Sequence, residues 1–206
     1  MARKTKEEAL ATRNQLLDAA QHVFSECGVS NTSLQEIACA AGVTRGAVYW
    51  HFENKTDLLA ALWDRVCLPI DAAMDELDQR YAEDPLARLE HKMLDVMQRV
   101  VNEKQTRDLM EILLLKCEYV PATEATRLHF VTQRESCLDQ TEQDFRAAVA
   151  CGQLPASTDT RMAALGLFAI FDGCCFHWLM APERFDLMAL ADNLVKAYLQ
   201  GLSKLS

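Results

Sequence analysis

Apolar residues recur along most of this 206-residue chain at steps of three and four, which is the spacing of amphipathic α-helices. The sequence contains no alternating β-branched strands, internal repeats or low-complexity linkers. Helices are expected at 6–26, 55–80, 85–102, 106–118, 123–151, 158–179 and 186–202, with two short ones between 32 and 53. Pro69 lies inside the second of these and predicts a kink or a break near 65–69. The pattern indicates an all-α protein of about nine helices.

The segment 32–56, TSLQEIACAAGVTRGAVYWHFENKT, is typical of a helix-turn-helix. Its first helix can begin with either of two capping boxes, Thr32–Gln35 or Ser33–Glu36. Gly42 then supplies the positive φ that ends this helix. A small residue at 38, glycine at 42 and a β-branched residue at 48 allow two helices to cross closely at a steep angle. The arrangement predicts a motif whose second helix meets DNA.

The second helix carries the side chains that major-groove recognition needs. Thr44 caps it and offers a hydroxyl to a phosphate, and Arg45 is the helix's only long donor, suited to bidentate contact with guanine. Tyr49 and His51 can donate to phosphates on either side of the groove. Lys55, at the start of the next helix, supplies a further charged phosphate contact.

Small and aromatic residues complete this predicted surface. Gly46 and Ala47 let the backbone approach the bases, and the Ala47 methyl suits a thymine methyl. For Trp50 and Phe52, DNA contact and packing within the small domain are equally open. The basic residues at 3–6 form either an arm for the minor groove or a solvated tail. The predicted DNA-binding residues are Thr32, Ser33, Thr44, Arg45, Gly46, Ala47, Tyr49, Trp50, His51 and Lys55.

These residues also carry a family resemblance. The run VTRGAVYWHFENKTDLLAAL closely resembles the DNA-binding domain of TetR-family transcriptional repressors. The opening MARKTKEEALATRNQLLDAA, the stretch MEILLLKCEYV and residues 172–187 resemble one branch of that family, the local repressors of multidrug (RND-type) efflux pumps. The resemblance implies a DNA-binding domain at 1–53 and a ligand-binding and dimerisation domain at 54–206. It also implies a repressor of an efflux-pump operon that hydrophobic small molecules release from a palindromic operator.

One helix-turn-helix reads too few base pairs for specificity in a genome, and a two-fold homodimer places two recognition helices on one face of the DNA. The last two predicted helices offer the surface for such a dimer, because the first is apolar almost all round and the second has a broad apolar stripe. The residues that form these surfaces are Ala163, Ala164, Leu167, Phe168, Phe171, Cys174, Cys175, Leu187, Leu190, Leu194, Val195, Tyr198 and Leu199.

The resemblance further implies a large apolar ligand cavity in the middle of the chain, open to drugs, dyes or phenolics. Its predicted lining is rich in polarisable side chains: Trp63, Cys67, Val96, Val100, Met110, Leu113, Leu114, Cys117, Cys137, Phe168, Phe171, Asp172, Cys175 and Phe176. Asp172 interrupts an apolar run, so it needs a partner. That partner is either a cationic ligand, or His177 or an arginine across a helix contact. Some members of the branch carry polar residues where this chain has Met110 and Leu114, which indicates a more apolar pocket.

Charge and cysteine content narrow the class of protein. The net charge is −9, but residues 1–55 hold six basic and six acidic residues, so all of the excess belongs to the rest of the chain. The eight cysteines form no CxxC pair, and buried free thiols are expected, with a redox switch at Cys174–Cys175 as the alternative. No metal or cofactor is expected. The polar opening and the apolar stretch 162–171, which stops at Asp172, predict a cytoplasmic protein without a membrane span.

Two other classes of function are weighed against a DNA-binding repressor. An enzyme is disfavoured because the sequence has no Ser-His-Asp arrangement, phosphate-cradling glycine loop or HExxH motif. An all-α ligand carrier would not need the Thr44–Gly46 segment or exposed aromatic residues after it. Within the family, a repressor of catabolic or envelope genes remains the alternative to a repressor of a drug pump.

Overall fold

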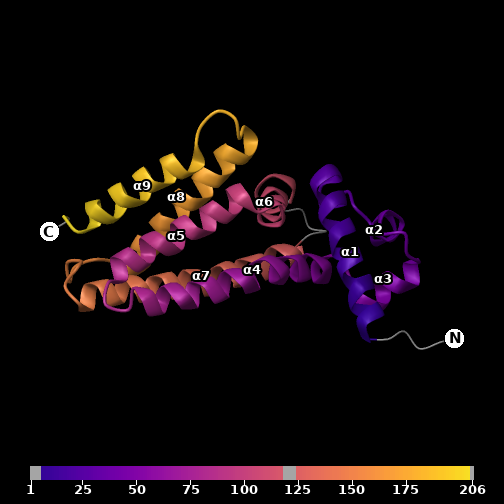
Figure 1. Ribbon diagram of the computed structural model, residues 1–206, viewed down its shortest axis with the longest axis horizontal. Coiled ribbons are helices and arrows are strands. Elements are labelled where there is room, and N and C mark those ends of the chain that lie inside the picture. Colours follow the sequence, from indigo (N-terminus) through magenta and orange to yellow (C-terminus); the bar gives the residue numbers. More distant parts are fainter. Residues whose placement is uncertain (1–5, 118–123, 205–206) are drawn as a thin grey trace. The chain divides into compact units, whose positions relative to one another are not determined.

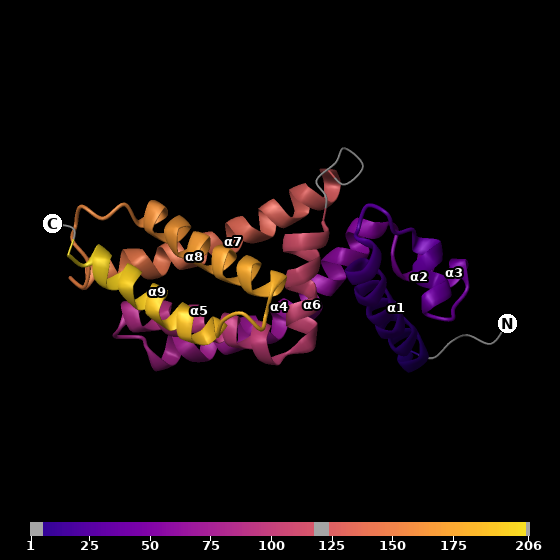
Figure 2. The same ribbon diagram turned by 90° about the horizontal axis from the view of Figure 1, so that it is seen from above.

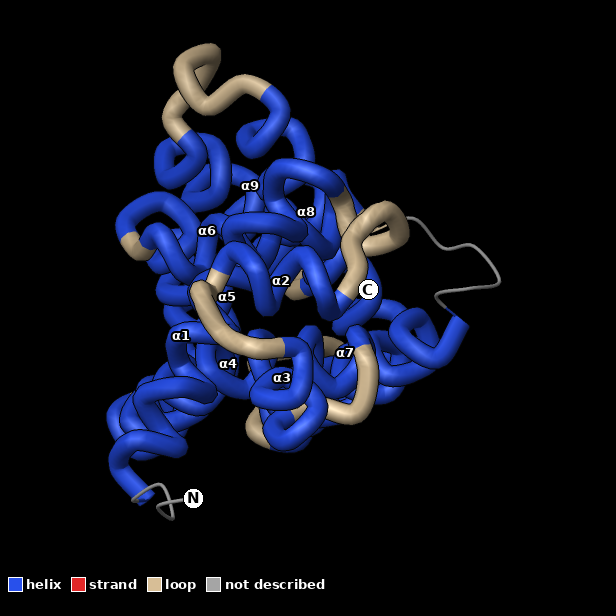
Figure 3. The backbone as a smooth tube through the Cα atoms, turned by 90° about the vertical axis from the view of Figure 1, so that its right-hand side faces the viewer, coloured by secondary structure: helices blue, strands red, loops and turns tan. Residues whose placement is uncertain are grey.

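The computed structural model describes residues 6–117 and 124–204. These residues form helices and loops and contain no strand, as Figure 3 shows. The elements are α1 (Lys6–Cys27), α2 (Leu34–Ala40), α3 (Arg45–His51), α4 (Lys55–Arg80), α5 (Pro85–Asn102), α6 (Lys104–Glu111), the π-helix η1 (Ile112–Lys116), α7 (Glu124–Ala150), α8 (Thr160–Met180) and α9 (Leu187–Leu202). The all-α prediction is confirmed.

The structure corrects one predicted helix and narrows the prediction for another. The sixth helix was expected at 106–118, but α6 begins at Lys104 and its last turns widen into the π-helix η1 from Ile112. Of the kink or break expected near 65–69, the break does not form, because α4 stays helical from Lys55 to Arg80 with Pro69 inside it. Pro69 cannot donate to the carbonyl four residues earlier, but it lies on an exposed face where water can satisfy that carbonyl.

The chain divides into two compact units, Met1–Cys67 with Asp108–Phe130, and Leu68–Arg107 with Val131–Ser206. In the first unit α1 packs against α2 and η1, and α2 packs against α3 (Figure 2). Its core consists of fully buried side chains from α1 to α4: Leu16, Leu17, Phe24, Ile37, Val48, Leu58, Leu59 and Leu62. This core places the short helices α2 and α3, which are too short to be stable alone.

The second unit is a helical bundle in which α9 lies against α5 and α8 (Figure 1). Its apolar core includes Leu89, Leu138, Phe145, Leu167 and Val195, one or more from each of α5, α7, α8 and α9. A buried carboxylate accompanies that core: Asp144 accepts from Arg88 Nε at 2.9 Å and from Lys92 Nζ at 3.0 Å. Loss of either partner would leave a buried charge poorly compensated.

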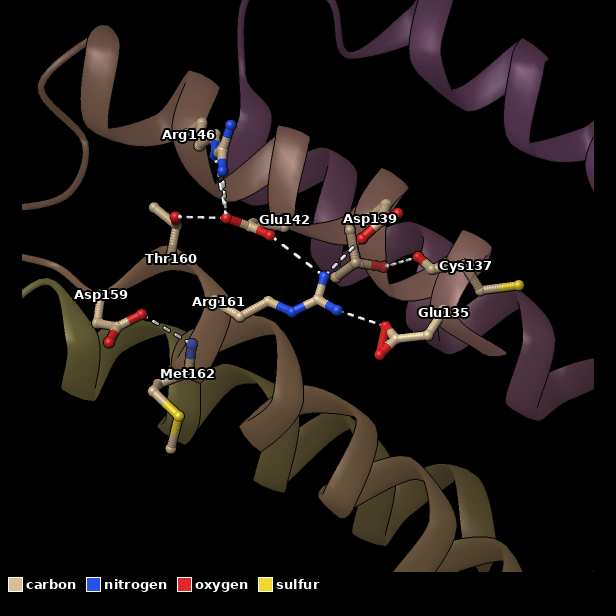
Figure 4. A network of polar contacts seen from close by, with 10 residues as sticks. Glu135, Cys137, Asp139, Glu142, Arg146, Asp159, Thr160, Arg161 and Met162 are labelled. Atoms are coloured by element: carbon tan, nitrogen blue, oxygen red, sulfur yellow. Dashed lines mark hydrogen bonds and ion pairs between the residues drawn. The ribbon is translucent and has the colours of Figure 1, made fainter. Parts of the chain in front are cut away.

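A polar network joins α7 to the first turn of α8 (Figure 4). Arg161 pairs with Glu135, with Asp139 at 2.6 Å and with Glu142 at 3.3 Å, three acids spaced along one face of α7. Glu142 also accepts from Thr160 Oγ1 at 3.2 Å. The network links the start of α8 to one face of α7 through partly exposed ion pairs, each of which contributes little to stability.

Helix α8 is long and apolar enough to cross a membrane by length and composition alone. The sequence pattern placed the end of an apolar stretch at Asp172, inside the helix predicted at 158–179, and the observed helix ends at Met180. A core helix of a soluble protein passes the same test, and α8 packs against α5 and α9. Only 33% of the most apolar 18-residue stretch of α8 is buried, however, so much apolar surface remains uncovered on the single chain.

Candidate DNA-binding surface

The helix-turn-helix is held in shape by two caps and a glycine. Ser33 begins α2 with a full capping box: its Oγ accepts from Glu36 N at 3.2 Å, and Glu36 Oε2 accepts from Ser33 N at 2.7 Å. Gly42 has φ +64°, the left-handed conformation that a glycine adopts without strain. Thr44 caps α3 by accepting from Ala47 N at 3.3 Å. The structure thus selects Ser33–Glu36 over Thr32–Gln35.

Thr32 was predicted to contact DNA, and the structure contradicts this. Its side chain is 3% exposed, and its hydroxyl donates to the Gly28 carbonyl at 2.7 Å. The hydroxyl turns inward because it satisfies a carbonyl left free at the end of α1. Ser33 is exposed, although its hydroxyl already donates to Glu36 Oε2 at 2.7 Å.

Helix α3 separates its aromatic residues into an outer and an inner set. Trp50 is 70% exposed, and Tyr49 is also exposed. Phe52 is 3% exposed and lies beneath the Arg13 guanidinium, 5.4 Å from its ring centre. Packing therefore explains Phe52, and it does not explain Trp50. The recognition helix therefore presents the Trp50 indole on its outer surface, next to the exposed Tyr49.

Arg45 lies along the same outer surface. Its guanidinium sits 5.3 Å from the centre of the Tyr49 ring, and its Nη2 donates to the Tyr49 hydroxyl at 3.4 Å. The contact joins positions i and i+4, so it keeps the arginine extended along the helix at small entropic cost. Gly46 is exposed and Ala47 half-buried. A Cβ on Gly46 would meet only Thr44 Oγ1, at 3.9 Å, so the backbone here is open to close approach.

His51 and Gln15 complete the local architecture. The half-buried His51 ring meets the Trp50 ring edge-on, with centroids 4.4 Å apart. Gln15 Nε2 on α1 donates to the Ala41 carbonyl at 2.7 Å, which ties the turn of the motif to the first helix. Sequence reasoning missed Gln15 and Arg13. Both act on residues at least 26 positions away, and no local pattern marks such pairs.

Lys55 was predicted to be a charged phosphate contact, and its main role in the structure is different. Its ammonium donates to the carbonyls of Val29 at 2.8 Å and Ser30 at 3.2 Å. These bonds engage two of its three N–H donors. Burial lowers the pKa of Lys55, and the charge of nearby Glu36 partly opposes that shift. Lys55 therefore fastens the loop before α2 to the start of α4.

The predicted ligand residues are divided between the two units. In the first, Trp63 packs on Phe130 with ring centroids 5.7 Å apart, and Cys67 is half-buried. Four further residues of the first unit, from the end of α6 through η1 to the position after it, are half-buried: Met110, Leu113, Leu114 and Cys117. These side chains are neither sealed into a core nor free in solvent.

In the second unit Val100 and Cys175 are buried, while Val96, Cys137, Phe168 and Phe171 are half-buried. Phe176 is exposed on α8, so the expectation that it lines an enclosed pocket is wrong for the single chain. A depression of about 350 Å³ that is open to solvent lies near the start of α8 and the end of α9. Its lining residues are Ser157, Thr158, Asp159, Met162, Ala163, Tyr198 and Leu202. None of its lining residues is among the predicted ligand residues.

Asp172 finds its partner within the same unit. Arg134 on α7 donates to both carboxylate oxygens, Nη1 at 3.0 Å and Nη2 at 2.5 Å, and its guanidinium lies 5.4 Å from the centre of the Phe168 ring. Of the alternatives for Asp172, the structure contains the arginine across a helix contact. The pair is partly exposed, so its Coulomb energy is screened.

Buried free thiols were expected at the eight cysteines, but the structure does not bury all of them. Cys174 and Cys175 are buried, whereas Cys27, Cys39 and Cys151 are exposed. Burial raises the pKa of Cys175 to about 12, with smaller contributions from Cys174 and Asp172. The Cys175 thiolate is then scarce at neutral pH, which argues against a redox switch at this pair because thiolates are the reactive form.

A capped helix-turn-helix with an outward-facing arginine and aromatic residues, followed by a larger helical unit, defines the class of helix-turn-helix regulators. Two family models match: "Bacterial regulatory proteins, tetR family" over residues 16–62 and "MAATS-type transcriptional repressor, C-terminal region" over residues 84–204. The chain belongs to the TetR family of bacterial transcriptional regulators, which are DNA-binding proteins.

Relatives and solved structures agree over nearly the whole chain. The HTH-type transcriptional regulator AcrR of Shigella flexneri is 41% identical, covering 97% of this chain and 93% of the relative. NalD, the secondary repressor of the MexAB-OprM multidrug efflux pump in Pseudomonas aeruginosa, has a TM-score of 0.85 at 34% identity, covering 98% of this chain and 100% of that chain. SmeT of Stenotrophomonas maltophilia, in a complex with triclosan, has a TM-score of 0.81 at 33% identity, covering 95% of this chain and 93% of that chain.

Proposed function

We propose that this chain is the homodimeric repressor of an operon that encodes a multidrug efflux pump, and that hydrophobic small molecules release it from its operator. The relatives that match nearly the whole chain carry the proposal, since NalD and SmeT are both repressors of multidrug efflux pumps. The domain at 1–53 would bind DNA and the domain at 54–206 would bind the ligand and the second subunit. A repressor with this role acts in the cytoplasm, where the DNA is.

The exposed face of α3 supports the DNA-binding half of the proposal. Arg45 would read guanine in the major groove, while Tyr49 and His51 would donate to phosphates. Trp50 would cover the sugar-phosphate backbone with its indole, whose N–H is a donor. Thr44 would contribute its hydroxyl hydrogen, because only the oxygen is used in capping α3. Lys55 retains one N–H for a phosphate, as a minor contribution.

The uncovered surface of α8 and α9 supports the homodimer. Large exposed apolar side chains lie along these helices at separations close to whole helical turns, and they are Met162, Leu165, Phe176, Met180, Leu190 and Leu194. Many of the residues predicted for this interface are instead buried within the unit: Ala163, Ala164, Leu167, Cys174, Cys175, Leu187, Val195 and Leu199. A second copy of the chain would cover the exposed stripe in a four-helix interface.

The half-buried Met, Cys, Leu and aromatic side chains support a hydrophobic effector. They are polarisable and change shape at low cost, which suits ligands of varied structure. Triclosan, the molecule bound to SmeT, is a suitable first probe. The continuous helix α4, which carries Lys55 at one end and Trp63 and Cys67 further along, would convey ligand binding to the DNA-binding domain.

Fluorescence anisotropy on operator DNA tests the proposal. A duplex selected from a random-sequence pool, together with the DNA upstream of the gene, would serve as target, and scrambled DNA as control. Tight binding that weakens with salt and is reversed by triclosan or other hydrophobic drugs is expected. Binding that no hydrophobic compound reverses would refute the effector, and the absence of any selected duplex would refute the DNA-binding role.

A further inference from the structure

The backbone of the loop at 28–33, which leads from α1 into α2, is hydrogen-bonded to two other segments of the first unit. The Val29 N–H donates to the Lys116 carbonyl at the end of η1, with an N···O distance of 3.1 Å. The Val29 carbonyl accepts from the Lys55 ammonium at the start of α4. The Val29 side chain is fully buried. The position of α2, and of α3 after it, is therefore set in part by where η1 ends.

The contact with Lys116 requires a glycine in the preceding position. Gly28 has φ +78°, and a Cβ built there would lie 3.2 Å from the Lys116 carbonyl oxygen, closer than ordinary van der Waals contact. Gly42 and Gly152 share the positive φ, but a Cβ on either would meet nothing within 4 Å. Among these three glycines, Gly28 alone combines the left-handed conformation with a close approach to another segment.

The segment that ends in this carbonyl is a π-helix. Such wide turns account for well under 1% of residues and are frequent at functional sites. A change of η1 to the α-helical register would turn its last residue by about 100°, one residue of α-helix, and would move the Lys116 carbonyl away from Val29. Leu113 and Leu114, two of the predicted ligand residues, lie within η1 and are half-buried. A ligand against them would therefore act directly on the π-helix.

The residues that lead into this segment are tied to two neighbouring helices. Asp108 in α6 accepts from Gln21 Nε2 on α1 at 2.8 Å. Gln21 in turn accepts from Arg65 Nη2 on α4 at 2.5 Å, and Arg65 Nη1 donates to Asp18 on α1 at 2.5 Å. These bonds join α1, α4 and α6 at Asp108. Any change of register in η1 is then expressed at Lys116, where the loop at 28–33 is attached.

We propose that η1 and the main-chain bond between Lys116 and Val29 form a coupling element that joins effector binding to the position of the helix-turn-helix. The element rests on the proposed function and specifies its regulation. It acts through the backbone of the loop at 28–33, and this route is separate from any tilt of α4 that ligand binding causes. Because coupling free energies are reciprocal, operator DNA that fixes this loop must also bias the register of η1, even when no effector is present.

Hydrogen–deuterium exchange on the full chain, with and without the selected operator duplex, tests this element directly. In the wild type the duplex is expected to change the exchange rate of peptides covering 110–117 by about fivefold or more, the usual lower range of allosteric coupling. In Gly28→Ala the response at 110–117 should be lost. The matched control is Gly152→Ala, which has the same backbone strain at φ +81° but no neighbour, and should respond as the wild type does.

A second variant separates loss of the bond from loss of folding. Replacement of the Val29 amide by an ester removes the N–H and leaves every side chain in place, and it should abolish the response while the duplex still binds. An unchanged response in this variant, or no response at 110–117 in a wild type that binds the duplex, would overturn the coupling element. A wild type that binds no selected duplex would instead overturn the proposed function.

Discussion

Trp50 and Phe52 are two residues apart, yet the first is 70% exposed and the second 3% exposed. The two positions point to opposite sides of the end of α3, and the Arg13 guanidinium covers Phe52 alone. The pair therefore separates a surface role from a packing role within a single turn, so one substitution should affect DNA binding and the other the stability of the fold.

Trp50→Ala is expected to leave the thermal midpoint within a degree or two and to weaken operator binding several-fold. Phe52→Ala is expected to reduce the free energy of unfolding by about 3–5 kcal/mol, the usual cost of removing a buried aromatic ring. Circular dichroism melts and fluorescence anisotropy on each variant measure the two effects. A Trp50→Ala protein that melts much earlier would contradict the surface role.

Arg45→Ala should cost about 1–3 kcal/mol of operator binding, because one bidentate contact with a base is worth that much. Affinity for scrambled DNA should fall much less, so the specificity ratio decreases. Arg146→Ala, at an exposed arginine of the second unit, is the control and should change neither affinity. An equal loss on cognate and scrambled DNA would show that Arg45 contacts phosphates alone.

Lys55→Ala should act chiefly on stability. It removes the donor for the Val29 and Ser30 carbonyls, and a carbonyl left without a partner costs about 1 kcal/mol when it is partly accessible to water. The expected result is a lower denaturant midpoint with a modest loss of DNA affinity. Lys55→Arg is the comparison, since it retains donors at this position. If Lys55→Ala weakened DNA binding greatly at unchanged stability, the phosphate role would be restored.

The capping box of α2 should make stability depend on pH in acid. Hydrogen bonds from the Ser33 side chain and then its backbone lower the pKa of Glu36. A lowered acid pKa contributes stability above the ordinary value for glutamate, and that contribution is lost as pH falls through the lowered value. Unfolding midpoints measured from pH 7 to 3 should fall less steeply for Glu36→Gln, which keeps an acceptor for Ser33. Parallel curves for the two proteins would contradict this origin.

The exposed stripe on α8 and α9 should control oligomeric state. Leu165→Asp together with Leu194→Asp places charges on surface that is exposed on the single chain, so the monomer should fold and the dimer should not form. Analytical ultracentrifugation is expected to show a monomer whose operator affinity falls at least a hundredfold. Leu68→Asp, at an exposed leucine of α4, is the control and should remain dimeric.

The sequence alone determined the features that depend on neighbours within about four residues. Pro85 predicted the start of α5, and the observed helix spans the predicted residues 85–102. The left-handed glycine at 42, the cap at Thr44 and the all-α class were predicted for the same reason, since caps, turns and apolar periodicity are written in adjacent positions. The family resemblance came from such a local run.

Tertiary structure decided which of several equivalent side chains face a partner. Helix α8 is apolar almost all round, so its sequence could not say which residues are core and which form the exposed stripe, and its packing against α5 and α9 decides this. Phe52 was ambiguous, and the carbonyl partners of Lys55 were not foreseen, for the same reason: the residues that surround them are more than 20 positions away. The sequence pattern did not predict the π-helix η1 either, because a widened turn leaves the spacing of the apolar residues along the chain unchanged. Burial is a property of the assembled fold, whereas caps and periodicity are properties of the chain.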